Sequence, residues 1–116
     1  MSTESIPITM SGKVAIVTAP GYVNEKNAEA ISEDCNSLIN GGGCLILIDM
    51  KECRMVNRVG VAIIIEIIEL LGEQEGRLAF CCLSETIAKT FQIMGLKELA
   101  GIYSDLEEAL AGLSAV

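Results

Sequence analysis

The sequence contains no histidine and no tryptophan, and its only aromatic residues are two tyrosines and two phenylalanines. Histidine is the commonest general base at neutral pH and a frequent metal ligand, so its absence excludes the Ser/His and Cys/His arrangements of nucleophilic catalysis. No GxGxxG or P-loop motif occurs either. The sequence therefore predicts a protein that has no catalytic residues, takes no cofactor and is not an enzyme.

Positive charge is scarce as well. Eight Lys and Arg residues stand against sixteen Asp and Glu residues, which gives a formal net charge of −8. Nucleic-acid-binding proteins present a basic surface to the phosphates, so this acidic chain argues against a nucleic-acid partner. Two interpretations of the acidity stay open: it keeps a hydrophobic protein soluble, or it steers the chain toward a basic partner.

Paired cysteine spacing is missing too. The five cysteines form no CxxC pair and their number is odd, so the sequence predicts neither a zinc site nor a disulfide framework. We expect reduced thiols, with Cys44, Cys81 and Cys82 packed as small core residues. Because the first ten residues lack the basic and apolar regions of a secretion signal, we expect a cytoplasmic protein.

No apolar run is long enough to cross a bilayer. The longest block, residues 59–71, is too short and carries Glu66 and Glu69. The sequence therefore predicts no transmembrane segment.

The sequence is rich in aliphatic residues, and this composition suits a β-sheet covered by helices. Its length of 116 residues predicts a single domain, 1–116. After an initial hairpin, each strand is followed by a helix, so these later strands should run parallel with right-handed crossovers. The expected elements are strands at 5–9 and 14–18, a helix at 24–39, a strand at 44–48, a helix at 57–72, a strand at 77–83, a helix at 84–95, a strand at 102–103 and a helix from 104.

Helical periodicity also predicts which side chains face the core. In the helix at 57–72, the core face should carry Gly60, Ile63, Ile64, Ile67 and Leu71, and the outer face Arg58, Ala62, Ile65, Glu66, Glu69 and Glu73. In the helix at 84–95, the expected core residues are Ile87, Ala88, Phe91 and Met94. In the last helix, Leu106, Ala109 and Leu110 should face the core, and Ser104 with Glu107 should form a capping box.

The candidate functional site lies where the strand at 44–48 leads into the helix at 57–72. Open α/β folds place binding sites where strand ends lead into helix N-termini, so we expect the site near Asn57, Arg58, Val59 and Gly60. Three of the eight cations, Lys51, Arg54 and Arg58, fall within eight residues here. Either they pair locally with Glu52 or Asp49, or they form a basic spot that, with the neighbouring Ala62 and Ile65, contacts an acidic partner or an anion.

Four segments together resemble a known family. The order GKVAIVTAPGYVNEKNAEAI, GGGCLILIDM, VNRVGVAIIIEII and GLKELAGIYSDLEEAL is similar to the STAS domain of anti-sigma factor antagonists and of the cytoplasmic tails of sulfate transporters. The resemblance covers nearly the whole chain. It implies an α/β fold with a mixed β-sheet, in which the first strand is antiparallel and the rest are mainly parallel, flanked by about four helices.

The resemblance also implies a function. In the bacterial regulators of this family, an Asp-Ser-x-Gly motif opens the second helix, and an anti-sigma factor with a histidine-kinase-like ATPase fold phosphorylates its serine or threonine. By position, Asn57 replaces the aspartate, Arg58 replaces the phosphoacceptor, and Gly60 matches the glycine. Asn57 can still cap the helix, because Asn and Asp serve about equally as caps. Residues 38–83 include no Ser, Thr or Tyr, so the sequence excludes the family's phosphorylation at this loop.

The resulting expectation is a protein-binding module that contacts a kinase-type anti-sigma factor without the phosphoswitch. The expected contact residues are Arg54, Asn57, Arg58, Val59, Gly60, Ala62 and Ile65. Two alternatives stay open. One is an accessory STAS subunit of a stress-signalling assembly or of a lipid-transport ABC complex, and the other is a sensor of a small anion or nucleotide held by Arg54 and Arg58. The sequence also leaves open whether the chain forms a homodimer.

Overall fold

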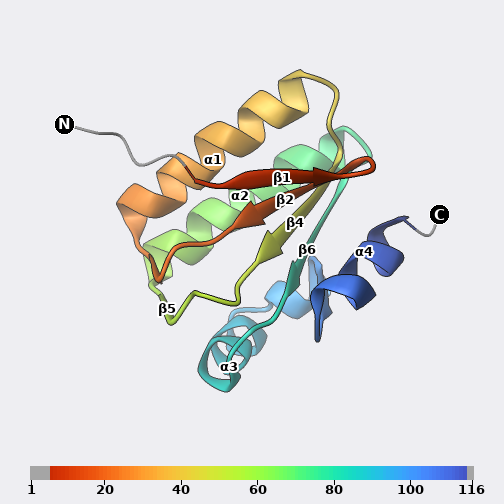
Figure 1. Ribbon diagram of the computed structural model, residues 1–116. Coiled ribbons are helices and arrows are strands. Elements are labelled where there is room, and N and C mark those ends of the chain that lie inside the picture. Colours follow the sequence, from red (N-terminus) through yellow and green to blue (C-terminus); the bar gives the residue numbers. More distant parts are fainter. Residues whose placement is uncertain (1–5, 115–116) are drawn as a thin grey trace.

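A five-stranded sheet forms the centre of the molecule, for which a computed structural model describes residues 6–114. Strand β1 pairs antiparallel with β2, and the pairs β2–β4, β4–β6 and β6–β7 are parallel. This mixed sheet with one antiparallel edge strand confirms the predicted fold class (Figure 1). Its strands, in spatial order, are β1 (Ile8–Ser11), β2 (Val14–Thr18), β4 (Leu45–Asp49), β6 (Arg77–Cys81) and β7 (Gly101–Tyr103).

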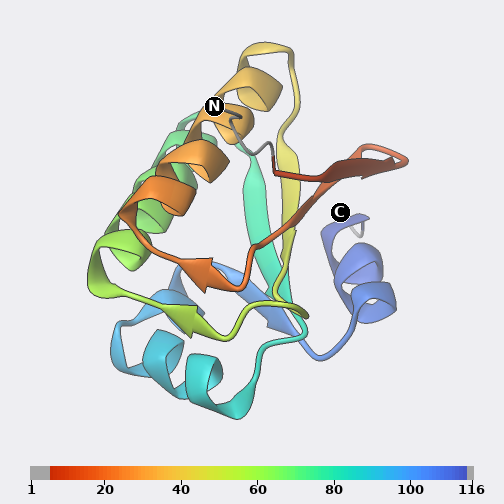
Figure 2. The ribbon, with the colours of Figure 1, turned by 60° about the vertical axis from the view of Figure 1, so that its left-hand side comes forward.

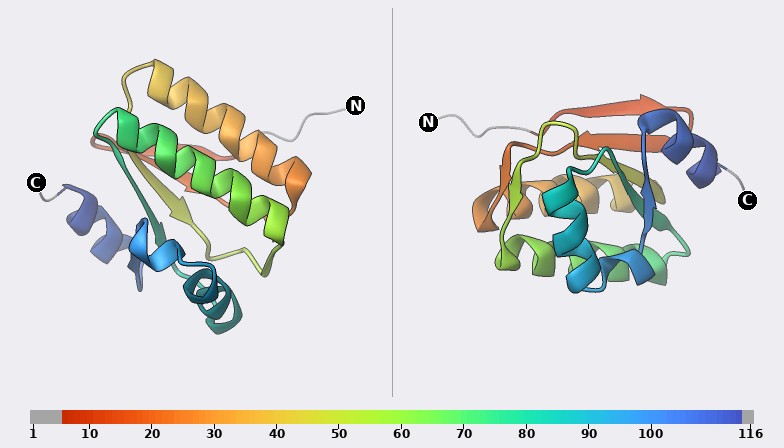
Figure 3. Two further views of the ribbon diagram at one scale, coloured as in Figure 1. Left: turned by 180° about the vertical axis from the view of Figure 1, so that it is seen from behind. Right: turned by 90° about the horizontal axis from the view of Figure 1, so that it is seen from below.

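Helices cover both faces of the sheet. Helices α1 (Glu25–Asn40) and α2 (Arg58–Glu73) lie side by side on one face, and α4 (Leu106–Ser114) lies on the other (Figures 1 and 3). Helix α3 (Glu85–Ile93) and the 3₁₀ turn η1 (Leu96–Glu98) connect β6 to β7. No helix within residues 6–114 is long and apolar enough to cross a membrane.

The core has two parts because the sheet is buried on both faces. Ile46, Leu47 and Ile48 of β4 are fully buried, as expected for a central parallel strand whose side chains alternate between two helix layers. Ile46 and Ile48 belong to the larger cluster with α1 and α2, while Leu47 packs with Ala109 of α4 in the smaller one. The rings of Phe80 and Phe91 meet edge to face at 4.9 Å in the larger cluster and attach α3 to the sheet.

Helix α2 follows the predicted boundaries closely, and most of its predicted core face is correct. Gly60, Ile64, Ile67 and Leu71 are buried. The fifth core position is Val61, whereas Ile63 is only half-buried against the core. Burial of this stripe holds a helix whose many β-branched residues have modest helix propensity.

A second, two-stranded sheet was not predicted. Strands β3 (Tyr22–Val23) and β5 (Met55–Val56) pair in parallel beyond the ends of β2 and β4 (Figure 2). The backbone N–H groups of Arg54 and Met55 both donate to the Gly21 carbonyl, at 2.8 and 3.2 Å. This β3–β5 ribbon holds the connection between β4 and α2 against the start of α1.

Other expectations require correction at chain ends and turns. The first strand begins at Ile8 rather than at residue 5, which lies outside the described residues. The cap of α4 is made by Asp105, whose carboxylate accepts the Glu108 N–H at 2.8 Å, and the Glu108 carboxylate accepts the Ser104 N–H at 3.0 Å. The expected Ser104/Glu107 box was therefore displaced by one residue.

Side-chain burial corrects six further expectations, and the first is Ala88 of α3, which is half-buried rather than buried. Met94 and Cys44 were expected in the core but are exposed, and Cys82 is half-buried. In α4, Leu113 and Ala109 are the buried residues, while Leu106 and Leu110 are half-buried. Met94, Cys44, Cys82 and Leu106 lie at or beside element ends, where periodicity says little about which neighbour covers a side chain.

Candidate functional site: the surface at the start of helix α2

Asn57 fixes the start of α2 against the β3–β5 ribbon. Its Oδ1 accepts the N–H of Gly60 at 2.7 Å, which satisfies one of the free donors of the first helical turn. Its own backbone N–H donates to the Val23 carbonyl at 3.1 Å, and its Nδ2 donates to the Tyr22 hydroxyl at 3.4 Å. The predicted cap is therefore confirmed, and it ties the helix to β3.

Gly60 lies where α2 touches β3. A Cβ atom at this position would collide with the Val23 carbonyl oxygen and would lie 3.1 Å from Val23 Cγ1. The backbone conformation is ordinary and helical, so the need for glycine comes from this close approach and not from a positive φ. Gly60 therefore sets the distance between the first turn of α2 and the ribbon.

Arg58 is the first residue of α2 and is exposed. Among residues 6–114, no carboxylate lies within 4.0 Å of the charged groups of Lys51, Arg54 or Arg58. The local ion pairs that the sequence left open, with Glu52 or Asp49, are thus not formed. All three cations are exposed, so the basic spot faces solvent.

Cys53 supports the loop that carries these cations. It is buried, and its thiol donates to the Met55 carbonyl at 3.5 Å. Burial raises the pKa of this thiol, while hydrogen bonds to the Met55 and Val23 backbone act in the opposite direction. The side chain thus packs under the ribbon as a neutral group, which keeps the loop in place.

An apolar area borders the basic spot. Arg58 lines a shallow depression of about 540 Å³ together with Thr90, Ile93 and Met94 of α3 and its end. Ile93 is 85% exposed, the highest value among the large exposed hydrophobic residues. Val59 at the start of α2, and Tyr22 and Met55 on the ribbon, are also exposed. We call Arg54, Arg58, Val59, Tyr22, Met55, Ile93 and Met94 the α2 surface.

Two of the predicted contact residues have different settings. Ala62 is exposed on α2, as expected. Ile65 was placed on the exposed face, but it is half-buried and packs against the main core, so it offers less surface than the sequence suggested. Glu66, Glu69 and Glu73 line a shallow groove between α1 and α2, consistent with an acidic outer stripe.

Four residues of the α2 surface were missed by sequence reasoning: Tyr22, Met55, Ile93 and Met94. Tyr22 and Met55 belong to strands of two residues, which are too short to give a periodic signal. Ile93 and Met94 were both placed within the expected helix at 84–95, with Met94 on its core face, but α3 ends at Ile93. Only the tertiary fold shows that the end of α3 lies beside Arg58.

One backbone donor in the first turn of α2 is already occupied. Small anions bind helix N-termini through the free backbone N–H groups. Here the Gly60 N–H is taken by Asn57 Oδ1, so an anion would find one donor fewer unless it displaced the cap. This weakens the anion-sensor alternative relative to contact with a protein partner.

Comparison with known proteins agrees with this fold. The sequence matches the STAS domain family over residues 5–109. A search of curated proteins finds no match.

Several solved structures have a similar fold. An anti-sigma-factor antagonist (STAS) domain protein from Planctomyces limnophilus is 20% identical, with a TM-score of 0.84 over 97% of this chain and 100% of the other. An anti-sigma factor antagonist from Mycobacterium paratuberculosis is 18% identical, with a TM-score of 0.82 over 94% and 92%. The Bacillus cell fate determinant SpoIIAA in its phosphorylated form is 20% identical, with a TM-score of 0.73 over 92% and 97%.

Proposed function

Because the chain belongs to the STAS domain family, we propose that it is a non-enzymatic, cytoplasmic binding module for an anti-sigma factor of the kinase type. Two of the structural relatives are named as anti-sigma factor antagonists. In this proposal the α2 surface is the contact surface. One observation carries this proposal. Arg58, which has no ion-pair partner among residues 6–114, lines one depression together with the exposed apolar side chains of Ile93 and Met94.

The composition of the α2 surface suits a protein partner. Exposed apolar residues beside polar ones are typical of contact patches, and arginine and methionine are enriched at interfaces. The unpaired cations would complement an acidic patch on the partner and would speed association at low salt. Asn57 and Gly60 contribute by holding α2 against the ribbon, so that the patch is already formed before the partner arrives.

The proposal also excludes one form of regulation, which is phosphorylation at the start of α2. One relative, SpoIIAA, is known in a phosphorylated form. By the family resemblance, Arg58 stands at the phosphoacceptor position of this chain, and residues 38–83 have no hydroxyl side chain. Serine or threonine phosphorylation at the start of α2 therefore does not regulate binding.

The test is binding of the purified chain to a purified kinase-type anti-sigma factor, measured by calorimetry at two salt concentrations. We expect Arg58→Glu to weaken binding by roughly tenfold or more and to reduce its salt dependence, because a cation of the contact patch is replaced by an anion. Lys13→Glu is the matched control: it makes the same charge change at an exposed site in the turn between β1 and β2. Arg58→Glu should leave the fold stable, since an acidic residue in the first turn favours a helix.

Equal losses of affinity in Arg58→Glu and Lys13→Glu would show that the effect comes from net charge alone, and would overturn the assignment of the α2 surface as the contact surface. A second readout addresses the missing switch. After incubation with the anti-sigma factor and ATP, mass spectrometry should find no phosphate on residues 50–60. Phosphate in this segment would contradict the proposal directly.

A further inference from the structure

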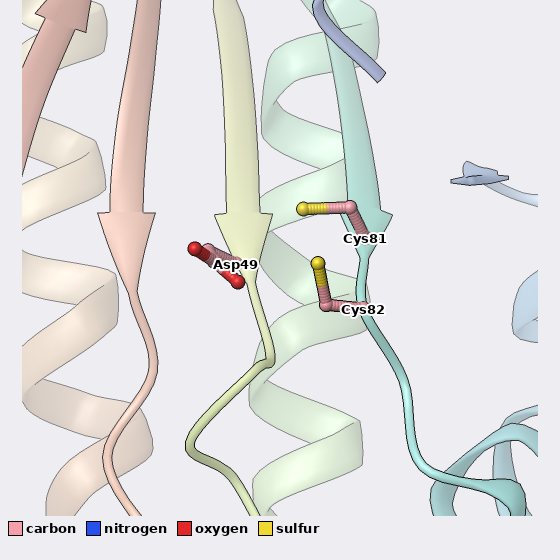
Figure 4. Close-up of side chains that lie close together, drawn as sticks. All are labelled: Asp49, Cys81 and Cys82. Atoms are coloured by element: carbon pink, nitrogen blue, oxygen red, sulfur yellow. The ribbon is translucent and has the colours of Figure 1, made fainter. Parts of the chain in front are cut away.

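Three potential metal ligands meet at the ends of two neighbouring strands. Asp49 ends β4, Cys81 ends β6, and Cys82 follows it; a carboxylate oxygen and the two sulfur atoms all lie within 4.8 Å of one another. Figure 4 shows the two sulfur atoms close together between the ends of these strands, with Asp49 beside them. The cluster is separate from the α2 surface, none of whose residues belongs to it.

The backbone explains why two adjacent cysteines lie together. Successive side chains of a strand point to opposite faces, so a continuous strand would separate Cys81 from Cys82. Here β6 ends at Cys81, and Cys82 has a φ of 64°, a conformation uncommon for a residue with a side chain. The Cys82 N–H donates to the Tyr103 carbonyl at 3.3 Å, which anchors this bend to β7. Both sulfur atoms consequently reach the α4 side of the sheet, where Asp49 lies opposite Cys81 in the parallel register.

The electrostatic environment favours a cation. Asp49 is the only charged residue among the described ones that is buried, with 8% of its surface exposed. One of its oxygens, Oδ1, accepts the Lys51 N–H at 3.0 Å, and no Lys or Arg of the described residues lies within 4.0 Å of the carboxylate. A buried carboxylate in such surroundings is costly without a compensating positive charge.

The ligand set selects the kind of metal. Two thiolates and one carboxylate suit Zn²⁺ and its chemical analogues better than Mg²⁺ or Ca²⁺, which prefer oxygen. With Zn–S distances of about 2.3 Å, a tetrahedral ion would place the two sulfur atoms about 3.8 Å apart. The present separations are at most about 1 Å larger, which side-chain rotation can close. Cys82 is half-buried, so a fourth position would remain open to water or another ligand.

We propose that Asp49, Cys81 and Cys82 form a binding site for a thiophilic divalent cation of the Zn²⁺ type. The metal binds as both thiols give up their protons to solvent, and the carboxylate supplies the third ligand through the oxygen not held by Lys51. The hydrogen bond from the Lys51 N–H orients the carboxylate in the way that supporting partners orient metal ligands. No cysteine motif predicts this site, because Asp49 and Cys81 are brought together only by pairing of β4 with β6.

The test uses the reduced full-length protein and the metals alone. We expect Co²⁺ to bind with one ion per chain, to give a thiolate-to-cobalt charge-transfer band and the visible bands of tetrahedral Co²⁺, and to be displaced by Zn²⁺. Cys82→Ser, at a half-buried position that tolerates the change, should remove the charge-transfer intensity of one thiolate and weaken Zn²⁺ binding by at least about tenfold. Asp49→Asn should weaken binding similarly and leave both thiolates bound, since its amide oxygen can still accept the Lys51 N–H.

Cys44→Ser is the matched control, because Cys44 is exposed and lies outside the cluster. It should leave the stoichiometry and the spectrum unchanged. Absence of a charge-transfer band in the wild type, an unchanged spectrum in Cys82→Ser, or loss of binding in Cys44→Ser would each overturn the proposal. None of these results depends on an anti-sigma factor, so the metal site and the proposed function stand or fall separately.

Discussion

Helix α2 contains two glycines that should respond in opposite ways to the same substitution, Gly60→Ala and Gly72→Ala. A methyl group at Gly60 would collide with the Val23 carbonyl and crowd Val23 Cγ1 and Asn57 Oδ1. A methyl group at Gly72 would meet no atom within 4 Å. The two variants therefore separate close packing from helix propensity within one helix.

The expected magnitudes follow from these surroundings. In a helix interior, Gly→Ala stabilises by about 0.5–1 kcal/mol; Gly72 is the penultimate residue of α2, so its gain should lie at or below the lower end of that range. At Gly60, overpacking against β3 costs about 1–3 kcal/mol, so the net change should be a loss of about 1–2 kcal/mol in the free energy of unfolding. Moving α2 away from the ribbon would also stretch the bond from the Asn57 N–H to the Val23 carbonyl.

The assay is urea denaturation followed by circular dichroism, with the midpoint compared at constant m-value. Gly72→Ala should raise the midpoint and Gly60→Ala should lower it. If Gly60→Ala were as stable as Gly72→Ala, α2 would not be pressed against β3 and the account of the site's rigidity would be wrong. In the binding assay, Gly60→Ala should also weaken the contact with the anti-sigma factor, whereas Gly72→Ala should not.

Two further predictions concern single side chains. Burial raises the pKa of Cys35 from 9.0 to about 12, with Asp34 adding to it, so the folded state keeps a proton that the unfolded state loses above pH 9. Its contribution to stability should be complete below pH 9 and decline between pH 9 and 12, with a loss of about 1.4 kcal/mol in the free energy of unfolding by pH 10. Urea titrations of the wild type and Cys35→Ala at pH 8 and 10 measure this loss, and an equal loss in both proteins would contradict the prediction. Ile93→Ser should leave the free energy of unfolding within about 0.5 kcal/mol, because the side chain is 85% exposed, yet weaken partner binding. Met10→Ser, at an exposed position of edge strand β1, is its control and should not change binding.

The sequence predicts those parts of the fold that depend on local periodicity. The apolar stripe of α2 and its Asn57 cap are confirmed because both follow from residues within the same helix. The run at 44–48, which is apolar on both faces, predicts a central strand, and β4 is a strand whose residues Ile46, Leu47 and Ile48 are fully buried. The initial hairpin and the strand–helix alternation after it also predict one antiparallel pair followed by parallel strands, and the sheet has this arrangement.

The remaining features depend on contacts between distant segments. Strands β3 and β5 have two residues each and exist only because they pair with each other. The exposure of Met94 depends on where α3 ends, and the proximity of Asp49 to Cys82 depends on strand register and on one unusual φ. The spacing of these residues along the sequence does not predict that they lie together, so the candidate metal site could not be predicted from the sequence.

The β3–β5 ribbon has a consequence for synthesis on the ribosome. Tyr22 cannot pair until Met55 has been made, and the depression beside Arg58 is incomplete until Met94 has emerged and α3 has docked. Contacts that span so much sequence form late in folding. A nascent chain or fragment that ends before residue 93 would lack Ile93 and Met94, which line the depression together with Arg58.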